Sequence, residues 1–216
     1  MDNVNGALFE TIVAGTVTTK AHLDCFILLM LNYPDVQERL IAEIQAAIPA
    51  DKSPTLADRE KLPFTEAVIL ENFRFMSPSP LCIAHKTTCD TCLGQYKLPK
   101  DTQIWTNVWG AQHDPRYFTD PLTFKPERFL DGDGKAYKLA DVKSLFPFGI
   151  GKRSCPGEKI ALDRIFLFVT NMMHKLRFVP VDKDNIPSCD LKTFTIAITY
   201  QTKPFYVKVE PLKRNG

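Results

Sequence analysis

The sequence predicts a mainly α-helical chain with small β-sheets. Long segments place apolar residues three and four positions apart, in the first third of the chain and again after residue 157, which is the spacing of an amphipathic helix. Other segments are short, alternate apolar with polar residues and are bounded by turn residues, as in small sheets. These helical and extended segments do not alternate as strand–helix–strand units, so no parallel sheet is expected.

The N-terminal part of the chain contains three expected helices. Residues 7–31 have a helical pattern, interpreted as two abutting pieces that end at Tyr33-Pro34. Residues 34–48 form an amphipathic helix that ends at Pro49. Residues 50–61 are polar and are expected to be a loop, and residues 63–75 form a third helix that is apolar nearly all round.

The rest of the chain is expected to hold short strands, an irregular segment, one more helix and a final hairpin. Residues 81–110 alternate and carry turn signals at Leu93-Gly94 and Pro99-Lys100. Residues up to 148 are rich in Pro, Asp and Gly and are interpreted as an ordered meander. Residues 160–173 continue a helix, and residues 194–209 alternate as a terminal hairpin would.

Length and composition exclude several classes of partner and of protein. A chain of 216 residues with 44% hydrophobic content can bury one sizeable core. A net charge of +2 without a long basic block argues against nucleic acid as a partner. The six cysteines lack the spacing of a small disulfide scaffold, so a reducing compartment is the default. No signal-peptide pattern opens the chain, and the longest apolar run, 26–31, is too short to span a bilayer.

One stretch, Phe-Gly-Ile-Gly-Lys-Arg-Ser-Cys-Pro-Gly at 148–157, indicates a cofactor site. Pro156 suits the first position of a helix, so Cys155 is expected at or next to the helix N-cap. The free N–H groups and partial positive charge of a helix N-terminus favour a thiolate. Gly149, Gly151 and Gly157 remove side chains where a flat group could approach the backbone. The stretch therefore predicts a thiolate ligand to a planar metal cofactor rather than an inert buried cysteine.

This stretch resembles the signature of the haem-thiolate monooxygenases, the cytochromes P450. The family pattern F-x-x-G-x-R-x-C-x-G is met at Phe148, Gly151, Arg153, Cys155 and Gly157. The resemblance implies haem b (iron protoporphyrin IX) as cofactor. It makes Cys155 the axial ligand of the iron and places Phe148 and Gly149 in the cofactor-binding loop.

A charged pair supports the resemblance. Glu71 and Arg74 lie three residues apart and share a face of a nearly all-apolar helix, so they are expected to be buried and to need further partners. By themselves they would also fit an exposed surface pair. In the P450 family this E-x-x-R pair binds an arginine of a later P-E-R-F motif, which Arg128 supplies here. The resemblance implies a structural network that braces the cysteine loop.

The first helix resembles the family segment that crosses the distal face of the haem. It reads Ala-Gly-Thr-Val-Thr-Thr at 14–19. The resemblance implies that Gly15 opens the helix for dioxygen and that Thr18 is the catalytic residue that assists protonation of the bound oxygen. Val17 stands where the family has an acid, which puts the efficiency of oxygen activation in doubt.

The resemblance also assigns contacts to the edges of the haem and to the substrate. His85 and Arg153 would bind the two haem propionates, since cationic or donor groups suit carboxylates. The small or apolar residues expected near the substrate, each of which would equally suit plain core packing, are Ala14, Leu81, Ile83, Ala84, Ile198 and Thr199.

A zinc module is the remote alternative at residues 82–92. Cys82, His85, Cys89 and Cys92 offer four soft ligands within eleven residues. Alternation along strands would point neighbouring ligands to different faces, and no glycine-rich turn lies between Cys89 and Cys92. The expectation is therefore short paired strands rather than a metal site.

The resemblance covers essentially the whole chain and is closest to animal microsomal members. It implies the C-terminal half of the P450 fold, from the distal I helix to the C-terminal hairpin. Residues 1–216 would form a partial haem-binding monooxygenase domain whose N-terminal half is missing. A truncated, non-catalytic fragment that binds a partner is the alternative.

The intact protein would insert one oxygen atom of O2 into a small apolar organic substrate. Its electron donor would be a flavoprotein NADPH reductase, which Lys143, Lys152 and Lys159 beside the cysteine loop could steer. The implied location is the cytoplasmic face of the endoplasmic reticulum membrane, with attachment only through the missing N-terminal part.

Overall fold

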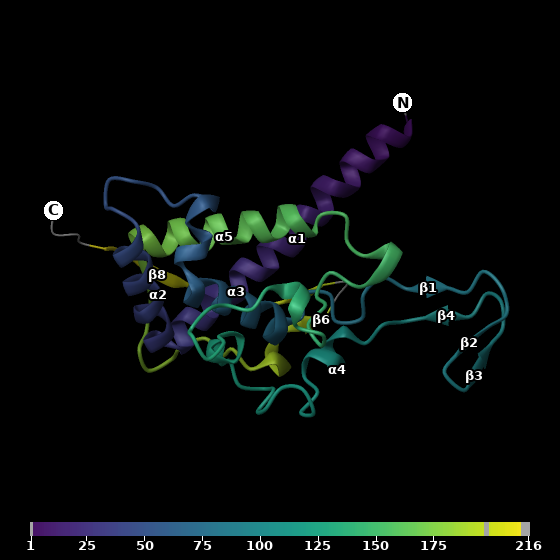
Figure 1. Cartoon of the computed structure of the whole chain (residues 1–216). Helices are drawn as coiled ribbons and strands as arrows, with labels where there is room; N and C mark the ends of the chain where they lie inside the picture. Colours follow the sequence, from purple (N-terminus) through teal and green to yellow (C-terminus); the bar gives the residue numbers. More distant parts are fainter. Residues whose placement is uncertain (1, 197–198, 213–216) are drawn as a thin grey trace.

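The fold is mainly helical with small two-stranded antiparallel sheets, as the sequence predicts (Figure 1). The computed structural model describes residues 2–196 and 199–212. The α-helices are α1 (Asp2–Asn32), α2 (Pro34–Ala47), α3 (Pro63–Met76), α4 (Val108–Gln112) and α5 (Glu158–Lys175). Short 3-10 helices are η1 (Leu56–Lys61), η2 (Pro126–Phe129), η3 (Leu139–Asp141), η4 (Gly151–Arg153) and η5 (Leu191–Thr193).

The core lies between the second half of α1 and helices α2, α3 and α5. Phe26, Leu40, Ile69 and Phe166, one from each helix, are almost completely buried. The expected bounds of α2 and α3 hold to within one residue. A second small cluster attaches the meander to α3 through Ala67, Leu70, Phe118, Phe129 and Leu145.

The first helix is continuous, so the expectation of two abutting pieces is wrong. The hydroxyls of Thr16 and Thr18 bond to the carbonyls of Ile12 and Ala14 four residues earlier, each at 2.7 Å. These bonds are compatible with helical backbone. One glycine costs a helix about 1 kcal/mol and does not end it.

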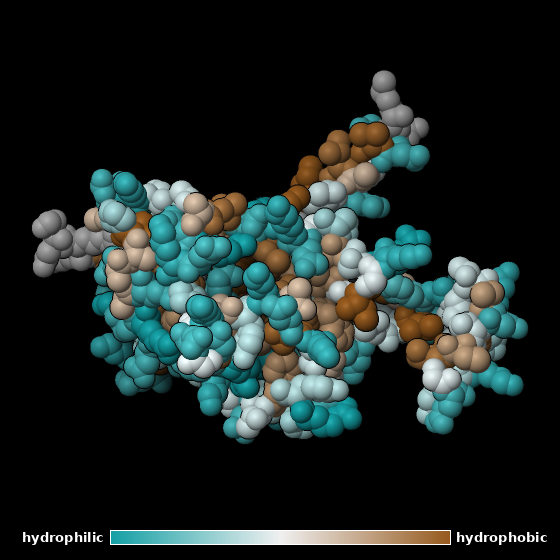
Figure 2. Space-filling model, viewed as in Figure 1, coloured by the Kyte–Doolittle hydropathy of each residue, from teal (hydrophilic) through white to brown (hydrophobic). Residues whose placement is uncertain are grey.

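The N-terminal part of α1 projects from the rest of the protein (Figure 1). Figure 2 shows apolar side chains along this part, where Val4, Leu8, Phe9 and Ile12 are exposed. By length and composition α1 could cross a bilayer, whereas the sequence expectation considered only a short apolar run. Part of α1 is buried in the core, and core helices of soluble proteins meet the same criterion, so this is weak evidence for a membrane span.

One further expectation about the helical part needs correction. The expected loop at 50–61 contains η1, because the Thr55 and Asp58 side chains form a capping box at its N-terminus. The carboxylate of Glu43 on α2 accepts hydrogen bonds from the backbone N–H groups of Phe64 and Thr65 at 2.7 and 2.8 Å. The first turn of α3 is therefore capped by another helix, since Leu62 offers no capping side chain.

The strands between residues 81 and 110 form an arm that extends away from the helices (Figure 1). The strands are β1 (His85–Lys86) with β4 (Gln103–Ile104), and β2 (Thr91–Leu93) with β3 (Tyr96–Leu98). Gly94 has φ +58° in the turn between β2 and β3, which is the left-handed region that favours glycine. The expected turn at Leu93-Gly94 is therefore confirmed.

The C-terminal hairpin is shorter than expected. Strands β6 (Thr195–Ile196) and β7 (Tyr200–Gln201) pair with each other. Strand β8 (Val207–Pro211) instead pairs with β5 (Leu176–Pro180), which directly follows α5. The expectation of one hairpin over 194–209 is therefore wrong, because the last strand finds its partner outside that segment.

Candidate functional site

The cysteine loop precedes α5 and has a defined backbone. The Cys155 N–H donates to the Phe148 carbonyl at 2.8 Å, which closes the loop on itself. Gly149 and Gly151 have φ +74° and +75°, where a side chain would strain the backbone. The Phe148 ring packs against Phe73 of α3, with 5.1 Å between ring centroids. The loop shape thus depends on its glycines and on one aromatic anchor.

Cys155 lies two residues before the helix N-cap, so the expected position at or next to the N-cap is corrected by one residue. The N-cap is Gly157, whose carbonyl accepts the first helical hydrogen bond from Ala161 at 2.8 Å. Pro156 therefore precedes the helix instead of occupying its first position. Pro156 and Gly157 form a turn closed by a bond of 3.4 Å from the Glu158 N–H to the Cys155 carbonyl.

The donor groups of this loop fit a planar iron cofactor with carboxylate substituents. Cys155 is a free, exposed cysteine, and a Cβ added at Gly157 would lie 3.7 Å from its Sγ. Arg153 is exposed and makes no ion pair within residues 2–196 and 199–212. A soft thiolate suits haem iron, and a guanidinium suits a propionate.

Glu71, Arg74 and Arg128 are brought together in one network beneath the meander. Arg74 binds the Glu71 carboxylate in a bidentate pair at 2.7 and 2.8 Å, and both side chains are fully buried. The Arg128 Nε donates to the same carboxylate at 3.1 Å. The Lys125 N–H donates to Glu71 Oε1 at 2.7 Å. The carboxylate is therefore matched by two guanidiniums and one backbone donor, as a buried charge requires.

The two arginines also hold the backbone of the meander. Arg74 Nη1 donates to the carbonyls of Gln112 and Pro121 at 3.0 and 2.7 Å. Arg128 Nη1 donates to the Thr119 carbonyl at 2.9 Å. The Gln112 side chain donates to the Phe73 carbonyl at 3.1 Å and to the Ser77 hydroxyl. The sequence analysis did not identify this residue. Nothing in the sequence marks Gln112, because the partners of its side chain are main-chain atoms and one serine hydroxyl far away in the sequence.

The expected distal residues lie where α1 leaves the core. Thr18 is half-buried, and its hydroxyl bonds to the Ala14 carbonyl at 2.7 Å. Ala14 and Val17 are exposed. A Cβ added at Gly15 would lie 3.7 Å from Nη1 of Arg164, so α1 passes close to α5 at this glycine.

The expected substrate and propionate residues fall on two connected segments. Leu81 and Ile83 are exposed, Ala84 is half-buried, and His85 is exposed at the start of β1. Thr199 is buried, and the next residue, Tyr200, donates its N–H to the Pro78 carbonyl at 3.0 Å. This bond joins the C-terminal hairpin to the segment before Leu81. Ile198 lies outside the described residues.

The zinc alternative gains no support from the structure. Within the described ranges, no three His, Cys, Asp or Glu side chains are arranged to hold a metal ion. Cys92 pairs with Lys97 in one ladder, whereas His85 pairs with Ile104 in another. Cys89 lies outside both ladders. The four expected ligands are therefore separated by strand pairing.

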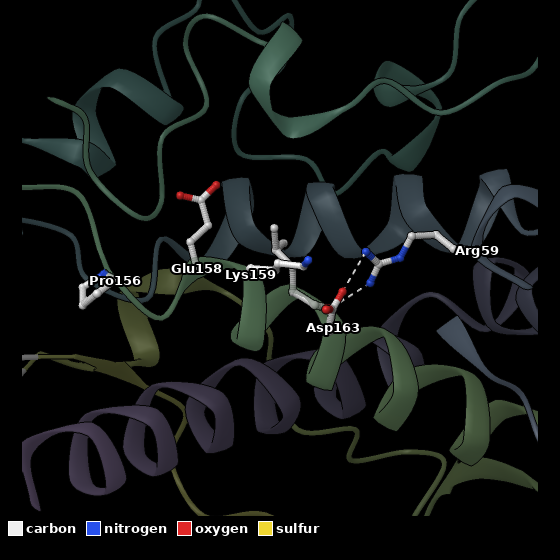
Figure 3. A pocket seen from close by; sticks show the side chains of 6 residues that line it. Arg59, Pro156, Glu158, Lys159 and Asp163 are labelled. Atoms are coloured by element: carbon white, nitrogen blue, oxygen red, sulfur yellow. Dashed lines mark hydrogen bonds and ion pairs between the residues drawn. The ribbon is translucent and has the colours of Figure 1, made fainter. Parts of the chain in front are cut away.

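A cavity of about 410 Å³ opens beside the first turns of α5, next to Pro156 (Figure 3). Its charged lining residues are Arg59, Glu158, Lys159 and Asp163. Arg59 is paired with Glu66 at 3.0 Å and with Asp163 at 3.1 Å. Lys159 is exposed at the rim. This side of the cysteine loop is therefore polar, in contrast to the exposed face of α1.

Two buried histidines flank the α3 network and should make stability depend on pH. Burial lowers the pKa of His22 to about 3, and burial together with the nearby Arg74 charge lowers the pKa of His113 to about 4. Both are neutral in the folded chain, whereas the unfolded chain binds protons below about pH 6.5. The unfolded state therefore gains protons first, and stability falls as the pH drops below 6.5.

We expect each histidine to lower the free energy of unfolding by about 2 kcal/mol when the pH falls from 7.5 to 5, since one pKa unit corresponds to about 1.4 kcal/mol. Urea unfolding of the ligand-free chain at these two pH values measures the loss. His22→Gln and His113→Gln should each lessen the loss by about 2 kcal/mol, because the groups that titrate in both the variant and the original chain cancel in the comparison. An unchanged pH dependence in both variants would contradict the assignment.

Comparisons with known proteins show which family the chain is similar to. The family model described as cytochrome P450 matches residues 1–209. Cytochrome P450 1A1 of Limanda limanda is 36% identical over 214 residues, which are 99% of this chain and 40% of that protein. Cytochrome P450 1A1 of Oryzias latipes is 41% identical over 177 residues, 82% of this chain and 34% of that protein.

A solved zebra fish cytochrome P450 with abiraterone is similar in structure. Its TM-score is 0.84 at 33% sequence identity, over 94% of this chain and 47% of that chain. The chain thus spans less than half the length of the relatives that it matches.

Proposed function

Because the chain belongs to the cytochrome P450 family, we propose that residues 1–216 are part of a haem-thiolate monooxygenase that oxidises a small apolar organic substrate with O2. Haem b, when bound, supplies the activation of dioxygen. The observation that carries the proposal is the exposed Cys155 in a loop whose backbone is fixed by two left-handed glycines and by the Phe148 carbonyl.

Each part of the site has one role in this proposal. Cys155 binds the iron as a thiolate and donates electron density to it. Arg153 and His85 bind the propionates through charge-assisted hydrogen bonds. The Glu71, Arg74 and Arg128 network holds the meander, and α3 supports Phe148 through Phe73. The protein therefore contributes ligation, orientation and a rigid frame.

The distal side handles protons and substrate. The Thr18 hydroxyl, which here bonds to the Ala14 carbonyl, holds the proton that oxygen activation needs. Val17 carries no acid, so protons reach Thr18 Oγ1 through water, and turnover is slower than with a carboxylate beside it. Ala14, Leu81, Ile83, Ala84, Ile198 and Thr199 would line the apolar substrate side and exclude water.

The partners and location follow from the same proposal. Lys159 lines the polar cavity beside Pro156, Lys152 is exposed in the cysteine loop, and Lys143 is exposed in the segment that leads into it. Exposed lysines there would attract an acidic flavoprotein NADPH reductase, with steering that weakens as salt rises. The intact protein would act at the cytoplasmic face of the endoplasmic reticulum membrane.

The test is the absorption spectrum of the 216-residue chain after addition of haemin, reduction with dithionite and exposure to carbon monoxide. We expect a red-shifted Soret band of the thiolate type. A chain that takes up no haem, or that gives only an unshifted band, would overturn the proposal and favour the non-catalytic alternative. The comparisons do not favour that alternative, since the structural match to a P450 covers 94% of the chain.

A further inference from the structure

A buried polar pair joins α1 to α3 and is not used by the proposed chemistry. His22 on α1 is 1% exposed and Asn72 on α3 is fully buried. The Asn72 Nδ2 lies 3.0 Å from His22 Nε2 and 3.0 Å from the His22 carbonyl oxygen. Both contacts cross from one helix to the other, so the two side chains connect the helices at one level.

The carbonyl contact fixes the direction of both hydrogen bonds. A carbonyl oxygen only accepts, so the Asn72 atom that faces it must be the amide nitrogen. That nitrogen then also donates to His22 Nε2, and the proton of the neutral ring lies on Nδ1. Burial keeps the ring neutral by lowering the pKa of His22 to about 3. The pair is therefore directional: Asn72 donates twice and His22 accepts twice.

The pair is continuous with the cysteine loop through aromatic rings. The His22 ring lies 4.2 Å from the Phe73 ring, and Phe73 lies 5.1 Å from Phe148, both measured between centroids. The Phe148 carbonyl in turn accepts the Cys155 N–H at 2.8 Å. Two ring contacts and one hydrogen bond therefore connect His22 on α1 with the Cys155 backbone.

Stability alone is a poor explanation for this pair. The His22 Nδ1 and Asn72 Oδ1 atoms are buried and have no hydrogen-bond partner within residues 2–196 and 199–212. Unsatisfied buried polar atoms are costly, and apolar side chains of similar size would fill the same space without that cost. Apolar contacts, however, would not fix how α1 is rotated against α3, whereas two hydrogen bonds to one amide do.

We propose that His22 and Asn72 are positioning residues that set the rotation of α1 relative to the cysteine loop. Thr18 lies one helical turn before His22, on the same side of α1. Fixing His22 against Asn72 and Phe73 therefore fixes both the Thr18 side of α1 and the Phe148 anchor of Cys155. This inference rests on the proposed function for the roles of Thr18 and Cys155, but the coupling between α1 and the loop is testable without haem.

The test is amide hydrogen exchange of residues 148–155 by mass spectrometry in the ligand-free 216-residue chain. His22→Leu and Asn72→Leu should each speed exchange in this loop about tenfold, which is what the loss of a buried hydrogen bond supplies. The double variant should add little to Asn72→Leu, because Asn72→Leu already removes both hydrogen bonds, of which His22→Leu removes only the one to Nε2. His22→Gln keeps an acceptor for Asn72 and should restore exchange to within about threefold of the original rate.

The matched control is Leu29→Ala, a cavity variant at a fully buried α1 residue two turns after His22. It should destabilise the chain without speeding exchange in the loop. Equal acceleration in Leu29→Ala, or unchanged exchange in His22→Leu, would overturn the proposal. If His22→Leu does not fold, Asn72→Ser replaces it, because the shorter serine side chain carries the donor away from His22. Unchanged loop exchange in Asn72→Ser, or equal acceleration in Leu29→Ala, would then overturn the proposal.

A second measurement links the pair to the haem site. In the haemin-loaded chain, His22→Leu should lower the fraction of the carbon monoxide complex with the thiolate-type band, and His22→Gln should restore it. An unchanged fraction in His22→Leu would count against the positioning role. If the original chain shows no thiolate-type band, the proposed function fails, while the exchange experiment still decides whether His22 and Asn72 position the loop.

Discussion

Glu71→Gln is expected to lower the free energy of unfolding by about 3–5 kcal/mol, because it leaves the buried Arg74 guanidinium and the largely buried Arg128 guanidinium without their countercharge. The Glu71 carboxylate accepts from Arg74, from Arg128 and from the Lys125 backbone, and it is fully buried. The change keeps the shape of the side chain, removes its charge and turns one acceptor oxygen into an NH2 donor that faces the arginine donors. A domain is stable by about 5–15 kcal/mol, so this loss is a large part of the total.

The measurement is urea unfolding of the ligand-free chain followed by circular dichroism. Glu38→Gln is the matched control, because it removes the same charge from an exposed pair with Arg177. Exposed pairs contribute about 0–1 kcal/mol, so the control should change little. A loss in Glu71→Gln no greater than that in Glu38→Gln would contradict the view that the α3 network holds the meander.

A further variant separates charge from geometry. Arg74→Lys keeps the positive charge but cannot reproduce the planar guanidinium, which reaches Glu71 and the carbonyls of Gln112 and Pro121 together. It should therefore destabilise the chain by more than Glu38→Gln.

Local pattern predicted most of the helices, and spacing predicted the charged network. Helix α2 has one apolar face between two prolines, which is sufficient to place it to within a residue. Glu71 and Arg74 could be named in advance because a charged pair on an apolar helix needs buried partners, whereas Arg128 was named from the resemblance to the family's P-E-R-F motif. The sequence did not show that Lys125, Gln112 and Pro121 complete the network, since those contacts use backbone atoms that any residue has.

One expectation was wrong because it concerned a partner far away in the sequence. β8 was assigned to the C-terminal hairpin, but its strand pattern does not say which strand it pairs with, and β5 is close in space after α5. The two pieces expected for α1 form one continuous helix, since neither one glycine nor the threonine back-bonds interrupt it. His22 and Asn72 were missed because their contact, like the pairing of β8, joins residues far apart in the sequence. Neither side chain indicates its partner.

Cys155→Ala should abolish the thiolate-type Soret band of the reduced carbon monoxide complex completely, because no other sulfur lies in the loop that carries Arg153. The same change should keep the free energy of unfolding of the ligand-free chain, measured with urea, within about 0.5 kcal/mol of the original value. The reason is that the Cys155 side chain is exposed. This combination is the opposite of Glu71→Gln, which should lower the free energy of unfolding while leaving the Cys155 sulfur in place.

Cys89→Ser is the control for Cys155, since it removes another exposed thiol on the distant arm and should leave the spectrum unchanged. A thiolate-type band that persists in Cys155→Ala would show that a different cysteine binds the iron. A band lost in both variants would point to general loss of haem uptake. Loss in Cys155→Ala alone, with unchanged stability, would assign ligation to one exposed sulfur and separate it from the buried network that shapes its loop.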